Sequence, residues 1–153
     1  RAKFVHIVRD PYLVYPSTLH FWKTMVETYG LQDPDVETMS ENVLSTFEQM
    51  HTRLEATRGL VDADRFYEMR YEDLVDNPSE QMRLLYEFIG LGDFETVRPA
   101  VEKYAERSNR YQTNAYDLDA ASRDVVTSRW SAYIQKHGYE TSASSAAPEA
   151  STI

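Results

Sequence analysis

The sequence predicts an α/β fold in which helices greatly outnumber strands. Two short segments, 3–8 and 65–71, have the composition of strands, and apolar periodicity predicts five helices around them. Two of these helices lie between the strands, and such a long helical crossover is typical of parallel pairing. Because two strands form a small sheet for so many helices, further strands are expected beside them.

The first strand is predicted over residues 3–8, KFVHIV, which are mostly apolar and do not alternate with polar residues. This pattern is typical of a strand buried on both faces of a parallel sheet. Pro11 fits the first position of the next helix and Asp10 fits its N-cap. Apolar residues keep helical spacing to about Tyr29. Pro16 is expected to bend this helix or delay its start.

The remaining elements follow from the same two periodicities. A second helix is predicted from about Thr38 to Arg58, and alternation in RFYEMRY predicts the second strand, 65–71. Later helices are predicted over 78–89, from about 94 or 97 to 107, and over 119–137.

Two segments lack apolar periodicity. Residues 108–118 are predicted to form a polar loop, and the small polar residues at the end predict disorder. We therefore expect residues 1–139 to form the structured part and 140–153 a disordered tail. Because the chain starts at Arg1, directly before a strand, and has few strands, we expect it to be the carboxyl-terminal portion of a longer domain.

Composition argues against several functions. The 153 residues include 16 Lys and Arg against 25 Asp and Glu, a formal net charge of −9, which argues against a nucleic-acid partner. Net charge does not exclude one local anion pocket. Without cysteine the chain has no disulfide, thiolate metal site or cysteine nucleophile. No apolar run reaches the roughly 20 residues that cross a bilayer, and no signal peptide is recognisable, so a cytoplasmic protein is expected.

Arg9 and Ser17 are the most informative polar residues. Arg9 follows the carboxyl end of the first strand, where open α/β sheets bind ligands. A phosphate there would meet a cation and the free N–H groups of the next helix. Ser17, eight residues later, could bond the same anion. From spacing alone, a surface ion pair between Arg9 and Asp10 is the simpler interpretation, with Ser17 exposed.

Three longer motifs carry a family resemblance. VHIVRDPYLVYPS resembles the 3′-phosphate-binding segment of PAPS-dependent sulfotransferases, in which Arg-Asp-Pro follows a strand and a Ser lies eight positions after the Arg. MRYEDLVDNPSEQMRLLYEFIGLGDFE is similar to the Tyr-Glu-Asp-Leu segment of that family. YQTNAYDL…RW…YIQKHGY resembles the terminal loop and Gly-Tyr ending of bacterial members and, more distantly, of tyrosylprotein sulfotransferases. The motifs occur in order between about residues 3 and 139.

The resemblance implies a three-layer, P-loop-kinase-like parallel sheet, of which this chain holds a helix-rich part. It implies transfer of a sulfuryl group from PAPS (3′-phosphoadenylyl sulfate) to a hydroxyl or amine acceptor, with adenosine 3′,5′-bisphosphate as the second product and no metal. Arg9 and Ser17 would bind the 3′-phosphate. Tyr71 would lie near the adenine, although a core position at a strand end is the alternative.

The resemblance also implies that the segment 107–116 folds over the nucleotide. Related bacterial sequences have basic residues near Gln112 and Ala115, and this chain has neither. Arg107 and Arg110 are the remaining cations of this segment, and either is a candidate replacement for a phosphate contact. Asn114 is a candidate nucleotide contact, or equally a turn residue. Glu72 and Asp73 are expected to be structural, as helix caps or as partners of an arginine.

No catalytic residue is assigned. The glycine-containing loop that binds the 5′-phosphosulfate, and the general base, are expected upstream of Arg1, so the chain alone should be inactive. His51 and His137 are expected to face solvent, and no histidine spacing indicates a metal site. The alternatives are a P-loop-kinase-like phosphotransferase fragment and a non-catalytic helical interaction module.

Overall fold

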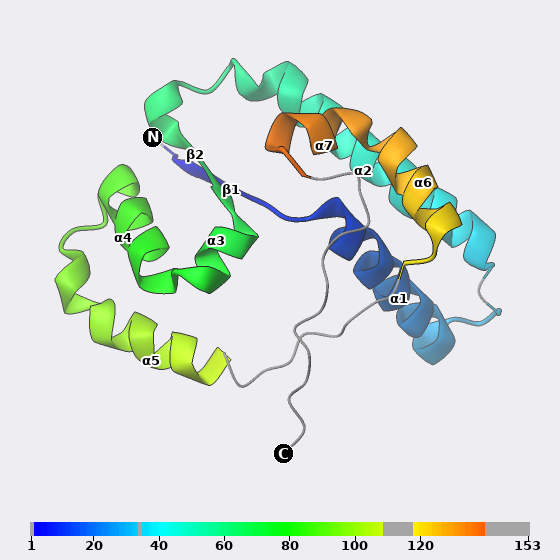
Figure 1. Ribbon diagram of the computed structural model, residues 1–153, viewed down its shortest axis with the longest axis horizontal. Helices are drawn as coiled ribbons and strands as arrows, with labels where there is room; N and C mark the ends of the chain where they lie inside the picture. Colours follow the sequence, from blue (N-terminus) through cyan, green and yellow to red (C-terminus); the bar gives the residue numbers. More distant parts are fainter. Residues whose placement is uncertain (1, 34, 109–117, 140–153) are drawn as a thin grey trace.

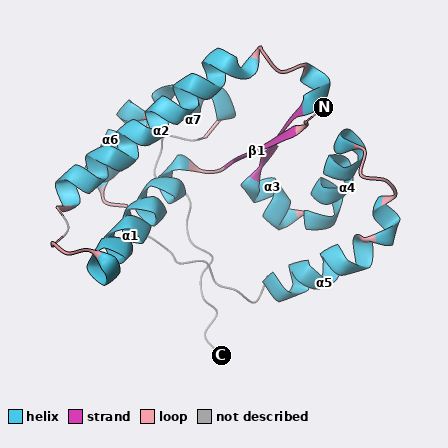
Figure 2. Cartoon of the chain, turned by 180° about the vertical axis from the view of Figure 1, so that it is seen from behind, coloured by secondary structure: helices cyan, strands magenta, loops and turns pink. Residues whose placement is uncertain are grey.

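A computed structural model describes residues 2–33, 35–108 and 118–139, and Figure 1 shows their arrangement. In chain order the elements are β1 (Phe4–Val8), α1 (Pro11–Tyr29), α2 (Val36–Arg58), the 3₁₀ turn η1 (Ala63–Arg65), β2 (Phe66–Arg70), α3 (Tyr71–Asp76), α4 (Pro78–Ile89), η2 (Phe94–Thr96), α5 (Arg98–Ser108), α6 (Ala120–Arg129) and α7 (Ser131–His137). The helices gather in two groups on opposite sides of the strands, with α1, α2, α6 and α7 in one and α3, α4 and α5 in the other (Figures 1 and 2).

The strands β1 and β2 pair in parallel, as the long crossover predicts, with Phe4 opposite Phe66 and Val8 opposite Arg70. The prediction that β1 is buried on both faces is wrong for the part of the chain that the structure describes. Val5 and Ile7 are 42% and 50% exposed, and β2 is the one described strand beside β1.

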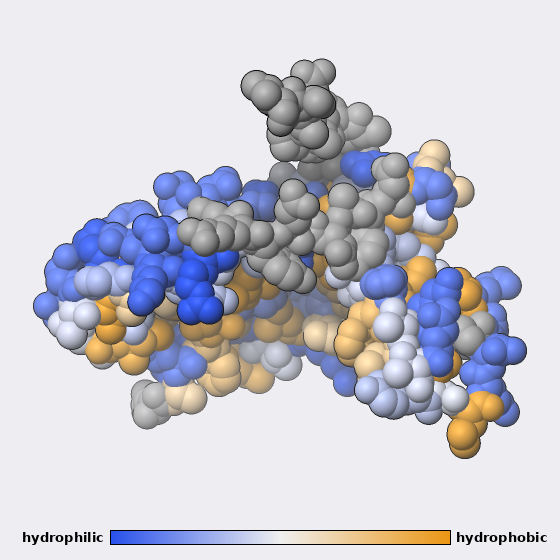
Figure 3. Space-filling view, turned by 90° about the horizontal axis from the view of Figure 1, so that it is seen from below, coloured by the Kyte–Doolittle hydropathy of each residue, from blue (hydrophilic) through white to orange (hydrophobic). Residues whose placement is uncertain are grey.

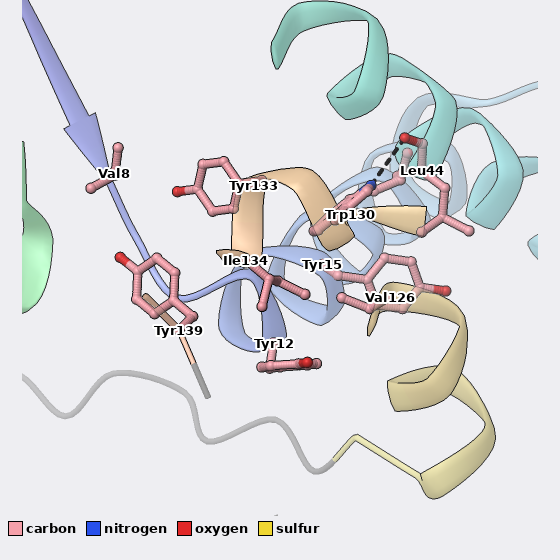
Figure 4. Close-up of a cluster of buried hydrophobic side chains, with 10 residues drawn as sticks. Val8, Tyr12, Tyr15, Leu44, Val126, Trp130, Tyr133, Ile134 and Tyr139 are labelled. Atoms are coloured by element: carbon pink, nitrogen blue, oxygen red, sulfur yellow. Dashed lines mark hydrogen bonds between the residues drawn. The ribbon is translucent and has the colours of Figure 1, made fainter. Parts of the chain in front are cut away.

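Trp130 organises the core on the α1 side of the sheet (Figure 4). Its ring stacks on Phe47 with centroids 3.9 Å apart, and its Nε1–H donates to the backbone carbonyl of Leu44 at 3.1 Å. This bond satisfies the indole N–H inside an apolar cluster, where an unpaired donor would be costly. The other buried members of the cluster are Val8, Tyr12, Tyr15, Val43, Leu44, Val126, Tyr133, Ile134 and Tyr139.

Two helical segments differ from the predicted ones. Trp130 has ψ of 22°, outside the α region, so the single helix predicted over 119–137 is divided into α6 and α7. The short helix α3 was predicted as a strand end and a turn, because six residues are too few to show a helical period. The helix α1 runs from Pro11 to Tyr29 as predicted, and Pro16 lies inside it without delaying its start.

The prediction that His51 and His137 face solvent is wrong. Their side chains are 13% and 5% exposed, and their ring centroids lie 6.2 Å apart. Burial lowers the pKa of both imidazoles and outweighs the opposite effect of the nearby carboxylates of Glu55 and Glu68. The Nε2 atoms of both rings are buried without a hydrogen-bond partner among the described residues, which fits the neutral form.

These histidines predict acid sensitivity. Below pH 6.5, their ordinary pKa, the unfolded chain binds protons that the folded chain excludes, so the free energy of unfolding should fall as the pH falls. Changing His51→Gln and His137→Gln together should flatten this dependence, measured by urea unfolding of the intact protein between pH 7 and 5. The exposed His20→Gln variant is the control, and an unchanged slope in the double variant would contradict the assignment.

Candidate functional site

The candidate site lies where β1 and β2 end side by side. Because Val8 pairs with Arg70, the next residues of the two strands, Arg9 and Tyr71, also lie close together. The guanidinium carbon of Arg9 is 4.3 Å from the centroid of the Tyr71 ring, within the range of a cation–π contact. The structure thus brings two of the sequence-predicted site residues together.

The Arg9 guanidinium has no hydrogen-bond or ion-pair partner among the residues described, and its Nε is buried. The simpler interpretation of the sequence, a surface ion pair between Arg9 and Asp10, is therefore not what the structure shows. A buried donor left unpaired costs about 1–3 kcal/mol, a cost that a bound anion removes. The guanidinium is available to a ligand while its plane is held by the tyrosine ring.

The start of α1 does not offer free amides to an anion, and that sequence-based expectation is wrong. Asp10 is the N-cap, and its Oδ1 accepts the Tyr12 N–H at 2.8 Å. The Leu13 and Val14 N–H groups donate to the Asp10 carbonyl at 3.1 and 3.0 Å, and Pro11 has no N–H. An anion next to Arg9 must therefore be bound mainly by side chains.

Tyr133 of α7 fixes the backbone of Arg9. Its hydroxyl accepts the Arg9 N–H at 3.0 Å and donates to the Arg9 carbonyl at 2.9 Å. Burial raises the pKa of the Tyr133 hydroxyl, which keeps it protonated and able to do both. One side chain thus satisfies both backbone groups of the residue that carries the free guanidinium.

Glu72 of α3 fixes the next residue. Its Oε1 accepts the Asp10 N–H at 2.8 Å, and its Oε2 accepts the Tyr139 hydroxyl at 3.1 Å and lies 3.8 Å from Arg70 Nε. Burial and the negative charge of Glu72 raise the pKa of Asp10 despite the Tyr12 N–H. The ion pair with Arg70 confirms the expected structural role of Glu72. The exposed Asp73 has no side-chain partner within the described ranges.

The other predicted site residues stand further from this network. Ser17 is half-buried on α1, about 9 Å along the helix axis from Pro11, and its hydroxyl bonds no described side chain. Arg110 and Asn114 lie outside the described residues. Sequence reasoning missed Tyr133 as a site residue, and the YIQKHGY motif that contains it was the available signal.

Two kinds of feature are absent from the described ranges. None of the helices there is long and apolar enough to cross a membrane. No group of three or more His, Cys, Asp or Glu side chains there is placed to hold a metal ion.

Comparison with known proteins identifies the family. Residues 1–96 match the model of the sulfotransferase family. This chain belongs to that family. Two curated relatives, both named omega-hydroxy-beta-dihydromenaquinone-9 sulfotransferase Stf3, from Mycobacterium bovis and Mycobacterium tuberculosis, are each 44% identical over 140 residues, which is 92% of this chain. The chain spans 36% of the length of these sulfotransferases.

A solved structure shares the fold. The crystal structure of sulfotransferase STF9 from Mycobacterium avium superposes with a TM-score of 0.61 at 19% sequence identity, covering 85% of this chain and 35% of that one. The helix-rich arrangement around a two-stranded parallel sheet is thus part of a sulfotransferase fold.

The adjacent carboxylates Glu72 and Asp73 give a matched test of the network. Glu72→Ala leaves the Asp10 N–H and the Tyr139 hydroxyl without their acceptor, so it should destabilise the intact protein by about 2–4 kcal/mol. Asp73→Ala removes an exposed carboxylate from the same helix and should change stability by about 0.5 kcal/mol or less. Urea unfolding of both variants is the measurement, and equal effects would show that Glu72 does not hold the strand end.

Proposed function

We propose that this chain carries the 3′-phosphate-binding half of the donor site in a PAPS-dependent sulfotransferase. The observation that carries the proposal is the Arg9 guanidinium, which is partly buried, stacked on Tyr71 and without a described partner. In the complete protein the two strands would belong to a three-layer, P-loop-kinase-like sheet.

The chemistry of the donor fits these side chains. A guanidinium offers a planar fork of N–H donors that matches the oxygens of a phosphate, and phosphate binding would satisfy the buried Nε. Ser17 would add a neutral donor to the same phosphate. The free face of Tyr71 would pack on the adenine, and Arg110 and Asn114 would contact the nucleotide from the segment between α5 and α6. Selection of PAPS over nucleotides without a 3′-phosphate would depend on Arg9.

The reaction would be an in-line displacement. The acceptor oxygen forms a bond to sulfur while the bond between sulfur and the 5′-phosphate oxygen breaks, and a general base takes the acceptor proton. The products are a sulfate ester and adenosine 3′,5′-bisphosphate. We assign neither this base nor the 5′-phosphosulfate loop to residues of this chain. Of the two acceptor classes we favour a hydroxyl, because the curated relatives are named for a hydroxylated acceptor.

Variants of Arg9 and Ser17 test the donor site. In the full-length enzyme, Arg9→Ala should weaken binding of adenosine 3′,5′-bisphosphate by a hundredfold or more, because a charge-assisted phosphate contact is lost, and Ser17→Ala by about fivefold. Arg9→Lys keeps the charge but loses the fork and the ring contact, so it should restore only part of the affinity.

The exposed Arg53→Ala variant on α2 is the control, and binding is measured by isothermal titration calorimetry. Tighter binding of ATP than of the bisphosphate would instead favour a phosphotransferase. Unchanged binding in the Arg9 and Ser17 variants would favour a non-catalytic interaction module.

A further inference from the structure

A groove between α1 and α2 begins next to Arg9. It encloses a cavity of about 750 Å³, within the range of about 300–1,000 Å³ that is usual for small-molecule sites. Ile7 and Arg9 line it where β1 ends, and Val14 and Val26 mark its extent on α1. Trp130, between α6 and α7, and Tyr133 of α7 complete this part of the lining. The groove therefore continues directly from the candidate donor site.

The lining is apolar and carries no negative charge. Nine of its sixteen residues are aliphatic, Met, Phe or Trp, and none is Asp, Glu or Lys. Its charged and titratable members lie near the donor site. His6 and Arg9 come from β1 and its end, and the His51 ring packs on Tyr133, whose hydroxyl bonds the Arg9 backbone. Although the chain has a net charge of −9, no acidic side chain lines this groove.

The groove is elongated. Its lining runs on α1 from Val14 to Val26 and on α2 from Met39 to His51, and each stretch spans about 18 Å along its helix axis. The apolar surface extends beyond the lining, since Phe21 and Met25 on the same helix are 54% and 37% exposed. Figure 3 shows hydrophobic side chains gathered across the middle of the molecule seen from below, while hydrophilic ones cover much of its outer surface.

We propose that this groove binds the hydrocarbon chain of the acceptor, a long-chain alcohol, with its hydroxyl at the Arg9 end. The proposal rests on the proposed function, which places the sulfuryl donor at that end. The hydroxyl oxygen bonds to the sulfur of PAPS, the 5′-phosphate leaves, and the proton passes to the general base. The products are an alkyl sulfate and adenosine 3′,5′-bisphosphate.

The lining favours this occupant over the other acceptors. A carbohydrate or a peptide would bury several polar groups, and Thr18, Asn42 and Thr46 are too few to pair with them. A hydrocarbon chain needs no such partners, and its transfer from water is favourable in proportion to its length. On α1 the lining continues beyond Val14 and Thr18 to Trp22, which is 50% exposed, so the lining stays open to solvent away from Arg9.

A series of primary alcohols of increasing chain length tests the proposal with the full-length enzyme and labelled PAPS. The kcat/KM should rise by about fourfold for each added CH₂ until the groove is filled. Trp22→Ala and Val26→Glu should flatten this series and raise the KM for the longest alcohol by at least tenfold, with the shortest alcohol unaffected. Leu60→Glu, at a residue that is 82% exposed and outside the groove, is the control.

Three results overturn the proposal. One is a series with no chain-length dependence, and another is a series unchanged in the groove variants. The third is loss of folding in both groove variants while the control variant folds. That result would show that the groove side chains pack against another part of the protein and not against the acceptor. Binding of adenosine 3′,5′-bisphosphate is measured on every variant, so failure of the donor site is seen separately and is not confused with failure of the groove.

Discussion

The candidate site depends on the hydrogen bonds that hold the backbone where β1 leaves the sheet. The Tyr133 hydroxyl pairs with both backbone groups of Arg9, and Glu72 accepts the N–H of Asp10. The carboxylate of Glu72 also accepts the Tyr139 hydroxyl. Because these contacts satisfy the backbone, the Arg9 guanidinium can remain unpaired without loosening the strand end. Residues separated by more than 120 positions thus act together to present one cation.

The same arrangement separates two kinds of chemistry. The polar groups around Arg9 suit a phosphate, while the groove between α1 and α2 suits an apolar chain. The helix α1 contributes to both, since its start follows the cation and one of its faces lines the groove. A helix that is apolar on most of its circumference is normally covered by other atoms. In our account the acceptor covers part of that surface.

Sequence periodicity was enough to predict both strands and most helices, and the parallel pairing followed from the crossover. Arg9 was named from its place after a strand and Tyr71 from the family resemblance, and their contact follows from the parallel pairing of the two strands. Sequence reasoning predicted Asp10 as the N-cap of α1, which the structure confirms, but it did not show that the capped amides are then not free for an anion. Nor could it find Tyr133, whose partner is 124 residues away, or the burial of His51.

The most direct measurement compares two nucleotides and two tyrosine variants of the full-length enzyme by titration calorimetry. Tyr133→Phe removes the hydroxyl that holds Arg9, and Tyr12→Phe removes one that pairs with Thr127 instead. Our account predicts that Tyr133→Phe weakens the binding of adenosine 3′,5′-bisphosphate by about tenfold and leaves the binding of adenosine 5′-monophosphate unchanged. Tyr12→Phe should change the affinity for neither nucleotide. Equal losses for both nucleotides, or wild-type affinity in Tyr133→Phe, would contradict it.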